Sequence, residues 1–206
     1  MPQVSLAEFV AAARQGDRLL SFATDTVPAL AIRPDRAELI FAAKQRSHTK
    51  PLILMGASSS DLWPFVRGAV EPHWQQAADR YWPGAVTLVL PASDALPAEV
   101  NPADPTSVGL RVPNQAIARH LLSQTGPLAT TSINRSGEPP LLHLENINAQ
   151  FPDVLTLQPL EIQQLERSLG IQSQPPSGLP STVVQWTEAG WQILRQGSVQ
   201  FEDQLD

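Results

Sequence analysis

Positively charged side chains cluster in one short segment of a chain that is otherwise poor in lysine. The sequence contains two lysines, Lys44 and Lys50, which flank Arg46, and His48 lies among them. The chain as a whole carries a net charge of −6. Lys and Arg side chains at this density suit a phosphorylated ligand, because they bind and neutralise its charge. A solvated surface loop is the alternative interpretation of the same residues.

Three further polar groups lie at the ends of predicted strands or helices, where open α/β sheets usually bind ligands. They are the pairs Thr24/Thr26 and Ser132/Asn134, and the group Ser181, Thr182 and Arg195. Residues two apart in an extended segment face the same way, so the members of each pair are expected to lie together. Hydroxyl and carboxamide groups bind phosphate oxygens without adding charge. Turn and cap chemistry explains any one group alone, but the recurrence of all four groups favours a phosphate-containing ligand.

Several common kinds of site are excluded. The sequence has no GxxxxGK[ST], GxGxxG or GxSxG motif and no readable Ser/His/Asp triad. It has no cysteine, so thiolate metal sites, disulfides and a cysteine nucleophile are ruled out. The histidines have no close metal-ligand spacing; they are His48, His73, His120 and His143. Asp25 either helps to hold a magnesium ion or orders its own loop, and no metal ligand is assigned.

The composition is that of a globular protein, with 206 residues, 42% of them hydrophobic and 17% charged. The acidic balance argues against a protein that coats nucleic acid or an anionic membrane. The first residues lack the features of a secretory signal, and the longest apolar runs are too short to cross a membrane. We therefore expect a cytoplasmic protein.

Hydrophobic patterning predicts the elements that position these groups. Strands are expected at 18–23, 51–55, 85–90, 108–112 and 128–133, with a hairpin from 181–186 and 191–195. Helices are expected at 6–15 with a Ser5/Glu8 capping box, from Pro34 onward, and at 61–68, 71–81 and 115–124, the last capped by Asn114. Segments 93–106 and 171–179 are predicted loops. The pattern predicts one α/β domain over residues 1–206 with a mixed sheet.

Two cations are expected to have special positions on these elements. Lys44 falls seven residues after Ala37 and four after Ile40, so it continues the buried face of its helix and is predicted to point into a cleft. Arg111 lies on an apolar strand, on the face opposite to Leu110.

Seven segments give the sequence a resemblance to the YrdC family from about residue 5 to residue 200. They are FATDTVPAL at 22–30, AKQRSHTKPLILM at 43–55, WPGAVTLVLP at 82–91, VGLRVP at 108–113, TTSINRSGEPP at 130–140, PSTVV at 180–184 and LRQGSV at 194–199. The combination of K-x-R, a downstream lysine, S-x-N-x-S-G and STVV is specific. The resemblance implies a twisted mixed sheet of parallel and antiparallel strands, surrounding helices and a concave, positively charged cavity.

The YrdC family comprises the threonylcarbamoyl-AMP synthases. The resemblance implies a nucleotidyltransferase that makes L-threonylcarbamoyladenylate from L-threonine, bicarbonate or CO2, and ATP with Mg²⁺, and releases pyrophosphate. A separate complex then transfers the threonylcarbamoyl group to an adenosine of tRNA. Any contact of this chain itself with tRNA would be weak.

The family motifs also imply site residues. The residues that would contact the nucleotide phosphates are Lys44, Arg46, Lys50, Ser132 and Asn134, of which the three cations would be catalytic. Those that would hold the adenylate are Ser181, Thr182 and Arg195. Those that would bind threonine are Thr24, Thr26 and Arg111, the last through the substrate carboxylate. Attack of a carbamate on the α-phosphate brings two anions together, so cations and positioning matter more than a general base.

The sequence departs from the family pattern beside the threonine site. Pro28 and Ala29 stand where Tyr and Gly are common, Ile133 replaces a common alanine, and Met55 stands near the position where many members carry a histidine. The end of the chain soon after LRQG is typical of the short, single-domain type. Two alternatives remain: a carbamoyl-transfer domain of hydrogenase maturation proteins, whose zinc-finger partner segments this cysteine-free chain has no room for, and a module that binds double-stranded RNA, which the net charge disfavours.

Overall fold

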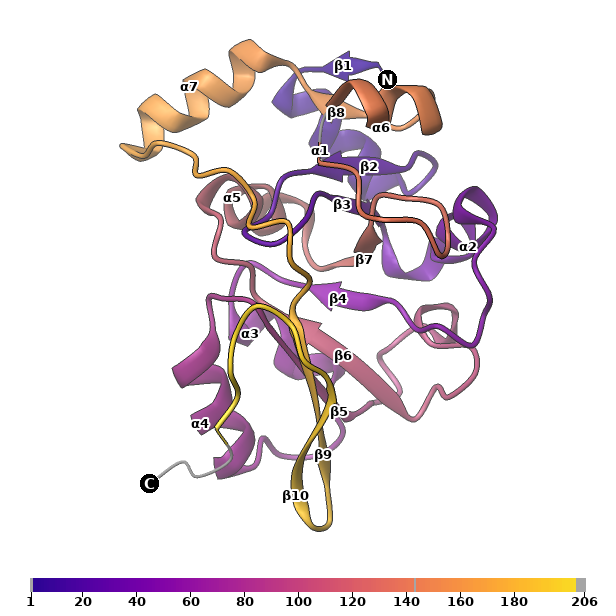
Figure 1. Cartoon of the computed structure of the whole chain (residues 1–206), viewed down its shortest axis with the longest axis vertical. Coiled ribbons are helices and arrows are strands. Elements are labelled where there is room, and N and C mark those ends of the chain that lie inside the picture. The colour runs from indigo at the N-terminus through magenta and orange to yellow at the C-terminus, as the bar shows by residue number, and fades with distance from the viewer. Residues whose placement is uncertain (1, 143, 203–206) are drawn as a thin grey trace.

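One long mixed sheet organises the molecule, for which a computed structural model describes residues 2–142 and 144–202. Its described strands, in spatial order, are β10 (Gly190–Arg195), β9 (Thr182–Thr187), β5 (Val86–Pro91), β6 (Ser107–Arg111), β4 (Ile53–Met55), β7 (Leu128–Ser132), β3 (Ala29–Ile32) and β2 (Leu20–Phe22). The pairs β4/β6 and β5/β9 are parallel and the other pairs are antiparallel. The strand direction turns along the molecule, from β2 at one end to the β9–β10 hairpin at the other (Figure 1).

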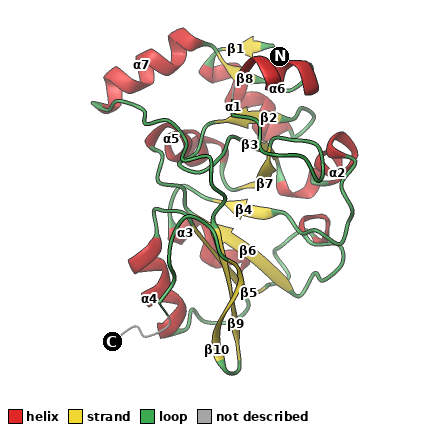
Figure 2. Ribbon diagram, viewed as in Figure 1, coloured by secondary structure: helices red, strands yellow, loops and turns green. Residues whose placement is uncertain are grey.

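A second, small sheet lies at the β2 end. It pairs β1 (Gln3–Val4) in parallel with β8 (Thr156–Leu157). The helices α6 (Leu144–Gln150) and α7 (Pro159–Leu169) gather around the same end (Figure 2). This part of the chain stands apart from the hairpin that carries Arg195.

Local sequence signals set the bounds of the first helices. In α1 (Leu6–Gln15), Ser5 and Glu8 form the predicted capping box, and the following Gly16 has a φ of 73°, a left-handed conformation that glycine adopts without strain. A 3₁₀ turn at Pro34–Arg36 leads into α2 (Glu38–Lys44). That helix ends because Gln45 is left-handed, with a φ of 50°, so the chain leaves the helix immediately after Lys44.

The remaining helices cover the two faces of the sheet. They are α3 (Ser59–Leu62), α4 (Pro72–Tyr81) and α5 (Ala116–Thr125), with short 3₁₀ turns at Trp63–Phe65 and Ala98–Val100. Buried side chains of α2, α3 and α4 pack against one face, and those of α1, α5 and α7 pack against the other. The second set covers the face only toward the β2–β3–β7 end, which leaves the rest of that face uncovered by helices (Figure 1).

Most predicted elements are confirmed with shifted ends, and some predictions were wrong. The 61–68 helix is only α3 followed by a 3₁₀ turn, because Pro64 interrupts it. The cap of α5 is Gln115, whose side chain accepts from the Ala118 amide, and not Asn114. Strand β3 was not predicted, because its four residues are buried on both faces and show no alternation. The sequence analysis also missed β1, β8, α6 and α7, while His143 lies outside the described residues.

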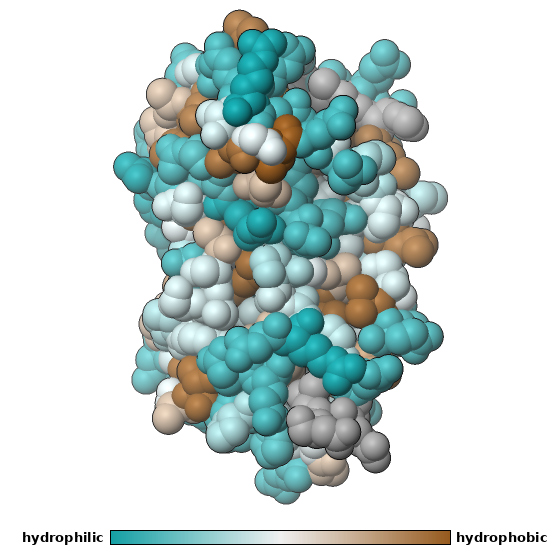
Figure 3. Space-filling model, turned by 90° about the vertical axis from the view of Figure 1, so that its left-hand side faces the viewer, coloured by the Kyte–Doolittle hydropathy of each residue, from teal (hydrophilic) through white to brown (hydrophobic). Residues whose placement is uncertain are grey.

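The side of the molecule that Figure 3 displays is largely polar. Figure 3 shows small apolar patches interspersed among hydrophilic side chains on one side of the molecule. Among the described residues, no helix combines the length and the hydropathy that crossing a bilayer requires.

Candidate active site

A cavity of about 750 Å³ opens on the part of the sheet that no helix covers. Alternate residues of five neighbouring strands line it. They are Val183 and Gln185 of β9, Thr87 and Val89 of β5, Ser107, Gly109 and Arg111 of β6, Ile53 and Met55 of β4, and Thr130 and Ser132 of β7. Their neighbours in sequence, such as Leu88 and Leu110, are buried in the core on the other face. The charged side chains that line the cavity are Arg46, Lys50, Arg111 and Arg195, with Asp104 and Glu138 as the acids. The cavity therefore has an excess of positive charge.

Arg46 and Lys50 reach the cavity from the loop that follows α2. Arg46 folds back over this loop and donates from Nε to the Lys50 carbonyl (3.0 Å) and from Nη2 to the Pro51 carbonyl (3.0 Å). Burial, and then the nearby charge of Arg195, lower the pKa of Arg46. The loop thus presents a preorganised pair of cations that an anion would stabilise.

Lys44 lies behind the cavity and does not line it. Its side chain is fully buried, at 1% exposure, and its ammonium donates to the Ser132 carbonyl and to Asn134 Oδ1 (3.2 Å). Burial, together with the nearby charges of Arg46 and Lys50, lowers its pKa to about 7. The prediction that Lys44 is on the buried helix face is confirmed. Its ammonium reaches Ser132 and Asn134, which line the cavity, although Lys44 itself does not.

Ser132 and Asn134 both line the cavity at the end of β7, as their spacing predicts. Ser132 donates from its hydroxyl to Asn134 Oδ1 (2.5 Å). The Asn134 amide nitrogen donates to the carbonyls of Arg135 (2.9 Å) and Glu138 (2.6 Å), which holds the side chain in place. The pair is therefore fixed from one side by Lys44 and from the other by the loop after β7.

Arg195 and Ser181 meet across the β9–β10 hairpin. Arg195 donates to the Ser181 carbonyl from Nε (3.2 Å) and from Nη2 (2.9 Å), and Ser181 Oγ lies 2.9 Å from Thr87 Oγ1. Both Arg195 and Ser181 line the cavity. Burial lowers the pKa of Arg195. The sequence correctly grouped these two residues.

Thr182 belongs to the same segment but faces the opposite way. It is fully buried, and its hydroxyl donates to the Val199 carbonyl (2.5 Å) and accepts from the Gly197 amide (3.0 Å). Its expected contact with the ligand has no support in this geometry, because strand alternation turns Thr182 away when Ser181 faces the cavity. It anchors the segment that follows β10.

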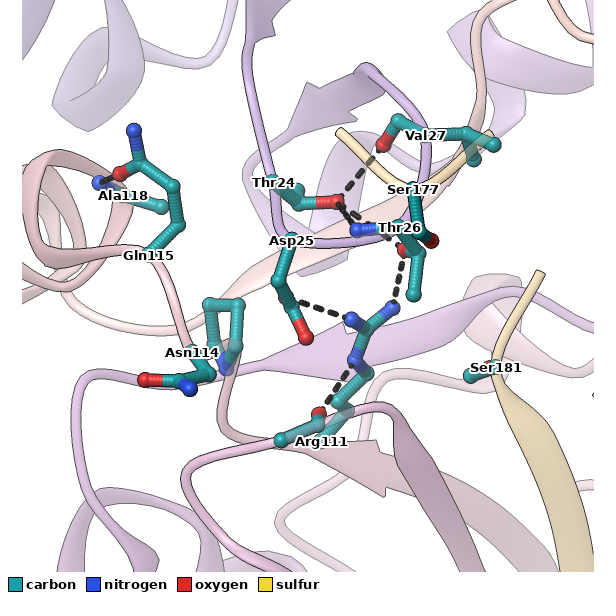
Figure 4. A network of polar contacts seen from close by, with 12 residues as sticks. Thr24, Asp25, Thr26, Val27, Arg111, Asn114, Gln115, Ala118, Ser177 and Ser181 are labelled. Carbon is teal, nitrogen blue, oxygen red and sulfur yellow. Dashed lines mark hydrogen bonds and ion pairs between the residues drawn. The ribbon is translucent and has the colours of Figure 1, made fainter. Parts of the chain in front are cut away.

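Arg111 lies at the end of β6, and each of its three guanidinium nitrogens donates one hydrogen bond (Figure 4). It donates from Nε to the Gly84 carbonyl (3.0 Å), from Nη1 to Thr26 Oγ1 (2.8 Å) and from Nη2 to Asp25 Oδ1 (2.7 Å). At 2% exposure it is not on a solvated face. Burial lowers its pKa, while Asp25 acts in the opposite direction.

The two threonines form a directional chain of hydrogen bonds (Figure 4). Thr24 Oγ1 donates to the Val27 carbonyl (2.7 Å) and lies 3.1 Å from Thr26 Oγ1. A hydroxyl has one proton, so Thr26 must donate to Thr24, while Thr26 accepts from Arg111. Thr26 lines the cavity, whereas the fully buried Thr24 lies behind it. Thr24 therefore supports the predicted pocket from behind and does not form its wall.

The described residues do not form a preformed metal site. In residues 2–142 and 144–202, no three His, Asp or Glu side chains lie close enough together to hold a metal ion. Asp25, considered above as a magnesium ligand, is paired with Arg111. Magnesium commonly binds through substrate phosphates, several waters and one or two carboxylates, and the carboxylates that line the cavity are those of Asp104 and Glu138.

The family model for Sua5/YciO/YrdC, described as "Telomere recombination", matches residues 12–197. The chain belongs to this family.

Relatives of this Sua5/YciO/YrdC chain agree with that result. A threonylcarbamoyl-AMP synthase of Chromohalobacter salexigens is 34% identical over 157 residues, which cover 74% of this chain and 83% of that protein. A variant of P. abyssi Sua5 superposes with a TM-score of 0.81 at 27% identity, and the match covers 94% of this chain and 56% of that one. P. abyssi Sua5 complexed with L-threonine gives a TM-score of 0.77 at 26% identity, covering 95% of this chain and 56% of that one. The chain thus spans a little over half of Sua5, and the predicted family and mixed α/β fold are confirmed.

For this member of the Sua5/YciO/YrdC family, three features of the site escaped the sequence analysis. They are the pairing of Asp25 with Arg111, the bond between Thr87 and Ser181, and the position of Gly109 in the cavity lining. The partners in the first two pairs are separated by 86 and 94 residues, so no local pattern could reveal them. A glycine within an apolar strand was the available signal for the third, because it marks close approach of a ligand or backbone.

Proposed function

We propose that the chain is a threonylcarbamoyl-AMP synthase, a nucleotidyltransferase that joins L-threonine, bicarbonate or CO2, and ATP. The amine nitrogen of threonine forms a bond to the carbon of CO2 and loses a proton, or it forms a bond to the carbon of bicarbonate with loss of water, and either route gives a carbamate. One carbamate oxygen then forms a bond to the α-phosphorus, the bond between that phosphorus and the bridging oxygen to the β-phosphate breaks, and pyrophosphate leaves. The product would pass to a separate complex that modifies tRNA.

The observation that carries the proposal is the convergence of unneutralised cations on one cavity. Arg46, Lys50 and Arg195 come from two distant segments and line it together. Of the ion pairs among the described residues, none involves these three side chains. Like charges that are held together in a partly buried site favour a polyanionic ligand. A triphosphate supplies the missing negative charge.

The second substrate is argued from Arg111 and from a relative. The guanidinium has five N–H groups, of which three donate within the described part of the chain. The remaining donors suit a planar carboxylate such as that of an amino acid. P. abyssi Sua5 has been solved with L-threonine, and we extend that ligand to this chain.

The roles proposed for the predicted residues follow their positions. Arg46, Lys50, Ser132, Asn134, Ser181 and Arg195 would contact the nucleotide directly. Lys44 would act from behind by holding Ser132 and Asn134, and Thr26 would bound the threonine site. The altered segment at Pro28 and Ala29 would form the adjoining wall, where the Pro28 carbonyl accepts from the Ile133 amide (3.0 Å).

Magnesium would enter with ATP. When bound to the phosphates it would neutralise charge that develops on the leaving pyrophosphate. Asp104 and Glu138 are the carboxylates that line the cavity, and they are the candidates to hold this ion or its water ligands.

Pyrophosphate release from ATP tests the proposal, with each amino acid supplied in turn and with or without bicarbonate. We expect release that requires both L-threonine and bicarbonate. Release that ignores threonine would overturn the assignment. Titration of the protein with tRNA at increasing salt tests the RNA-binding alternative, which requires tight binding with a steep loss of affinity.

A further inference from the structure

Asp25 forms the one ion pair that the described residues make at the cavity. Its Oδ1 lies 2.7 Å from Arg111 Nη2, with side-chain exposures of 17% for Asp25 and 3% for Arg111. The other ion pairs in the described part of the chain are Arg33–Asp35, Arg36–Glu38 and Arg80–Glu202, and all involve solvent-exposed side chains. A buried pair at the cavity thus differs from the surface pairs in both position and environment.

Asp25 is itself held in place by the loop that passes behind it. The Ser177 amide donates to the Asp25 carbonyl (3.1 Å), and the Gly178 amide donates to the Thr26 carbonyl (2.8 Å). Both bonds join the segment before β9 to the turn after β2. The carboxylate is therefore presented to Arg111 from a backbone that two consecutive amides of one segment hold in place.

Asp25 does not line the cavity, whereas Arg111 does. Each group at the guanidinium acts on a different nitrogen: Gly84 on Nε, Thr26 on Nη1 and Asp25 on Nη2. Of these three partners, Asp25 is the charged one, so its bond to Nη2 is the one that joins two opposite charges. Removal of Asp25 would release the Nη2 end of the guanidinium and leave the bonds to Gly84 and Thr26 as its remaining restraints.

We propose that Asp25 is a positioning residue for the amino-acid substrate, because it fixes the plane of the Arg111 guanidinium so that the remaining N–H groups face the substrate carboxylate. The inference rests on the proposed function. It makes the orientation of Arg111, and not only its charge, the basis of threonine binding. Misplacement of a binding group by about 1 Å can cost about 100-fold in rate.

A second effect of Asp25 would act in the opposite direction. Its negative charge weakens the attraction between Arg111 and any incoming carboxylate. If this effect were dominant, neutralising Asp25 would lower the KM for threonine. Positioning of Arg111 by Asp25 predicts that the KM for threonine rises instead. The sign of the change in this KM therefore separates the positioning effect from the charge effect.

The experiment compares Asp25→Asn and Asp25→Ala with the wild-type chain. Asparagine keeps an oxygen in place without the charge, and it remains informative if the alanine variant fails to fold. We expect the KM for threonine to rise about fivefold or more in Asp25→Asn and further in Asp25→Ala, with the KM for ATP changed less than about twofold. Direct calorimetric binding of L-threonine in the presence of a non-hydrolysable ATP analogue should weaken by the same factor.

Asp35→Asn is the matched control, because it removes the charge from an Asp–Arg pair far from the cavity with side-chain exposures of 40% and 50%. It should leave both KM values unchanged. An unchanged or lowered KM for threonine in Asp25→Asn would overturn the inference, as would equal rises for both substrates. A wild-type protein that releases no pyrophosphate with threonine would instead overturn the proposed function.

Discussion

The ammonium of Lys44 and the side chain of Asn134 are hydrogen-bonded at 3.2 Å, which links the last residue of α2 to the loop after β7. This bond connects the cation-bearing loop after α2 to the polar residues that line the cavity. It also buries an ionisable amine whose pKa is about 7. The chemistry of the site is therefore expected to depend on pH near neutrality.

We predict that binding of Mg·ATP takes up protons at about pH 8. Lys44 is mostly neutral there in the free protein, because its pKa is lowered to about 7. A nearby phosphate favours the charged form and raises this pKa, so a proton enters with the ligand. Calorimetry in buffers of different ionisation enthalpy measures the uptake. Equal apparent enthalpies in all buffers would contradict the assignment, and Lys44→Met should remove the buffer dependence.

The stability of the protein without ligand should rise as the pH increases from about 7 to about 10.5. In this range the unfolded chain holds a proton on Lys44, at its ordinary pKa of 10.5, that the folded chain lacks. The free energy of unfolding therefore decreases as the pH falls toward about 7, because protonation of Lys44 favours the unfolded chain. Thermal melts at about pH 7 and about pH 9.5 should differ less for Lys44→Met than for the wild-type chain. An identical pH response in the two proteins would refute the prediction.

Lys50→Ala should impair adenylate formation about 100-fold or more with little change in stability. Lys50 lines the cavity but is exposed, so its removal leaves no buried group unsatisfied. Pyrophosphate release measures the activity, and a thermal melt checks the fold. Arg36→Ala removes a charge of the same sign from an exposed position outside the cavity and serves as the control. Full activity in Lys50→Ala would support the alternative interpretation, in which Lys50 belongs to a solvated loop and does not contact the nucleotide.

Arg111→Lys should raise the KM for threonine about tenfold or more, which corresponds to about 1.4 kcal/mol. Lysine keeps the charge, but it cannot bond Gly84, Thr26 and Asp25 from one planar group. The KM for ATP should change much less. Equal losses for both substrates would indicate disruption of the sheet, and no loss for either would remove Arg111 from the site.

Gly197→Ala should destabilise the protein by about 1–3 kcal/mol and weaken nucleotide binding. A Cβ at this position would overlap the backbone of Pro180, Ser181 and Thr182, so the Ser181 segment would have to move. Chemical unfolding and ATP titration measure the two effects. Gly109→Ala is the stability control, since its Cβ would meet Thr87 at an ordinary 3.4 Å. Equal stabilities of the two variants would contradict the expected clash.

Local signals predicted those parts of the molecule that local interactions determine. The Ser5/Glu8 box, the Gly16 cap and the pairing of Ser132 with Asn134 depend on residues within a few positions of each other. The sequence could place Lys44 on the buried face of its helix. It could not show that Ser132 and Asn134 hold the Lys44 ammonium, because these contacts span 88 and 90 residues.

Alternation placed Thr24 and Thr26 on the same face, and the family motifs implied that both Ser181 and Thr182 hold the ligand. Ser181 lines the cavity and Thr182 is buried, and this choice follows from the register of β9 against β5. Likewise Thr26 lines the cavity and Thr24 does not, because the turn after β2 is set by Arg111 from a distant strand. The sequence identified residues of the right chemical type, but which of their side chains face the cavity depends on how the strands pair in the sheet.

The distribution of the cavity-lining residues along the chain, from Thr26 to Arg195, has a consequence for folding. A partly folded chain that lacks any one of the central strands cannot assemble the site, because the site draws on pairings between segments far apart in sequence. ATP should therefore bind the native state alone and add the whole of its binding free energy to the global stability, by RT ln(1 + [L]/Kd). The cellular concentration of the nucleotide would then help to set the lifetime of the protein against proteolysis.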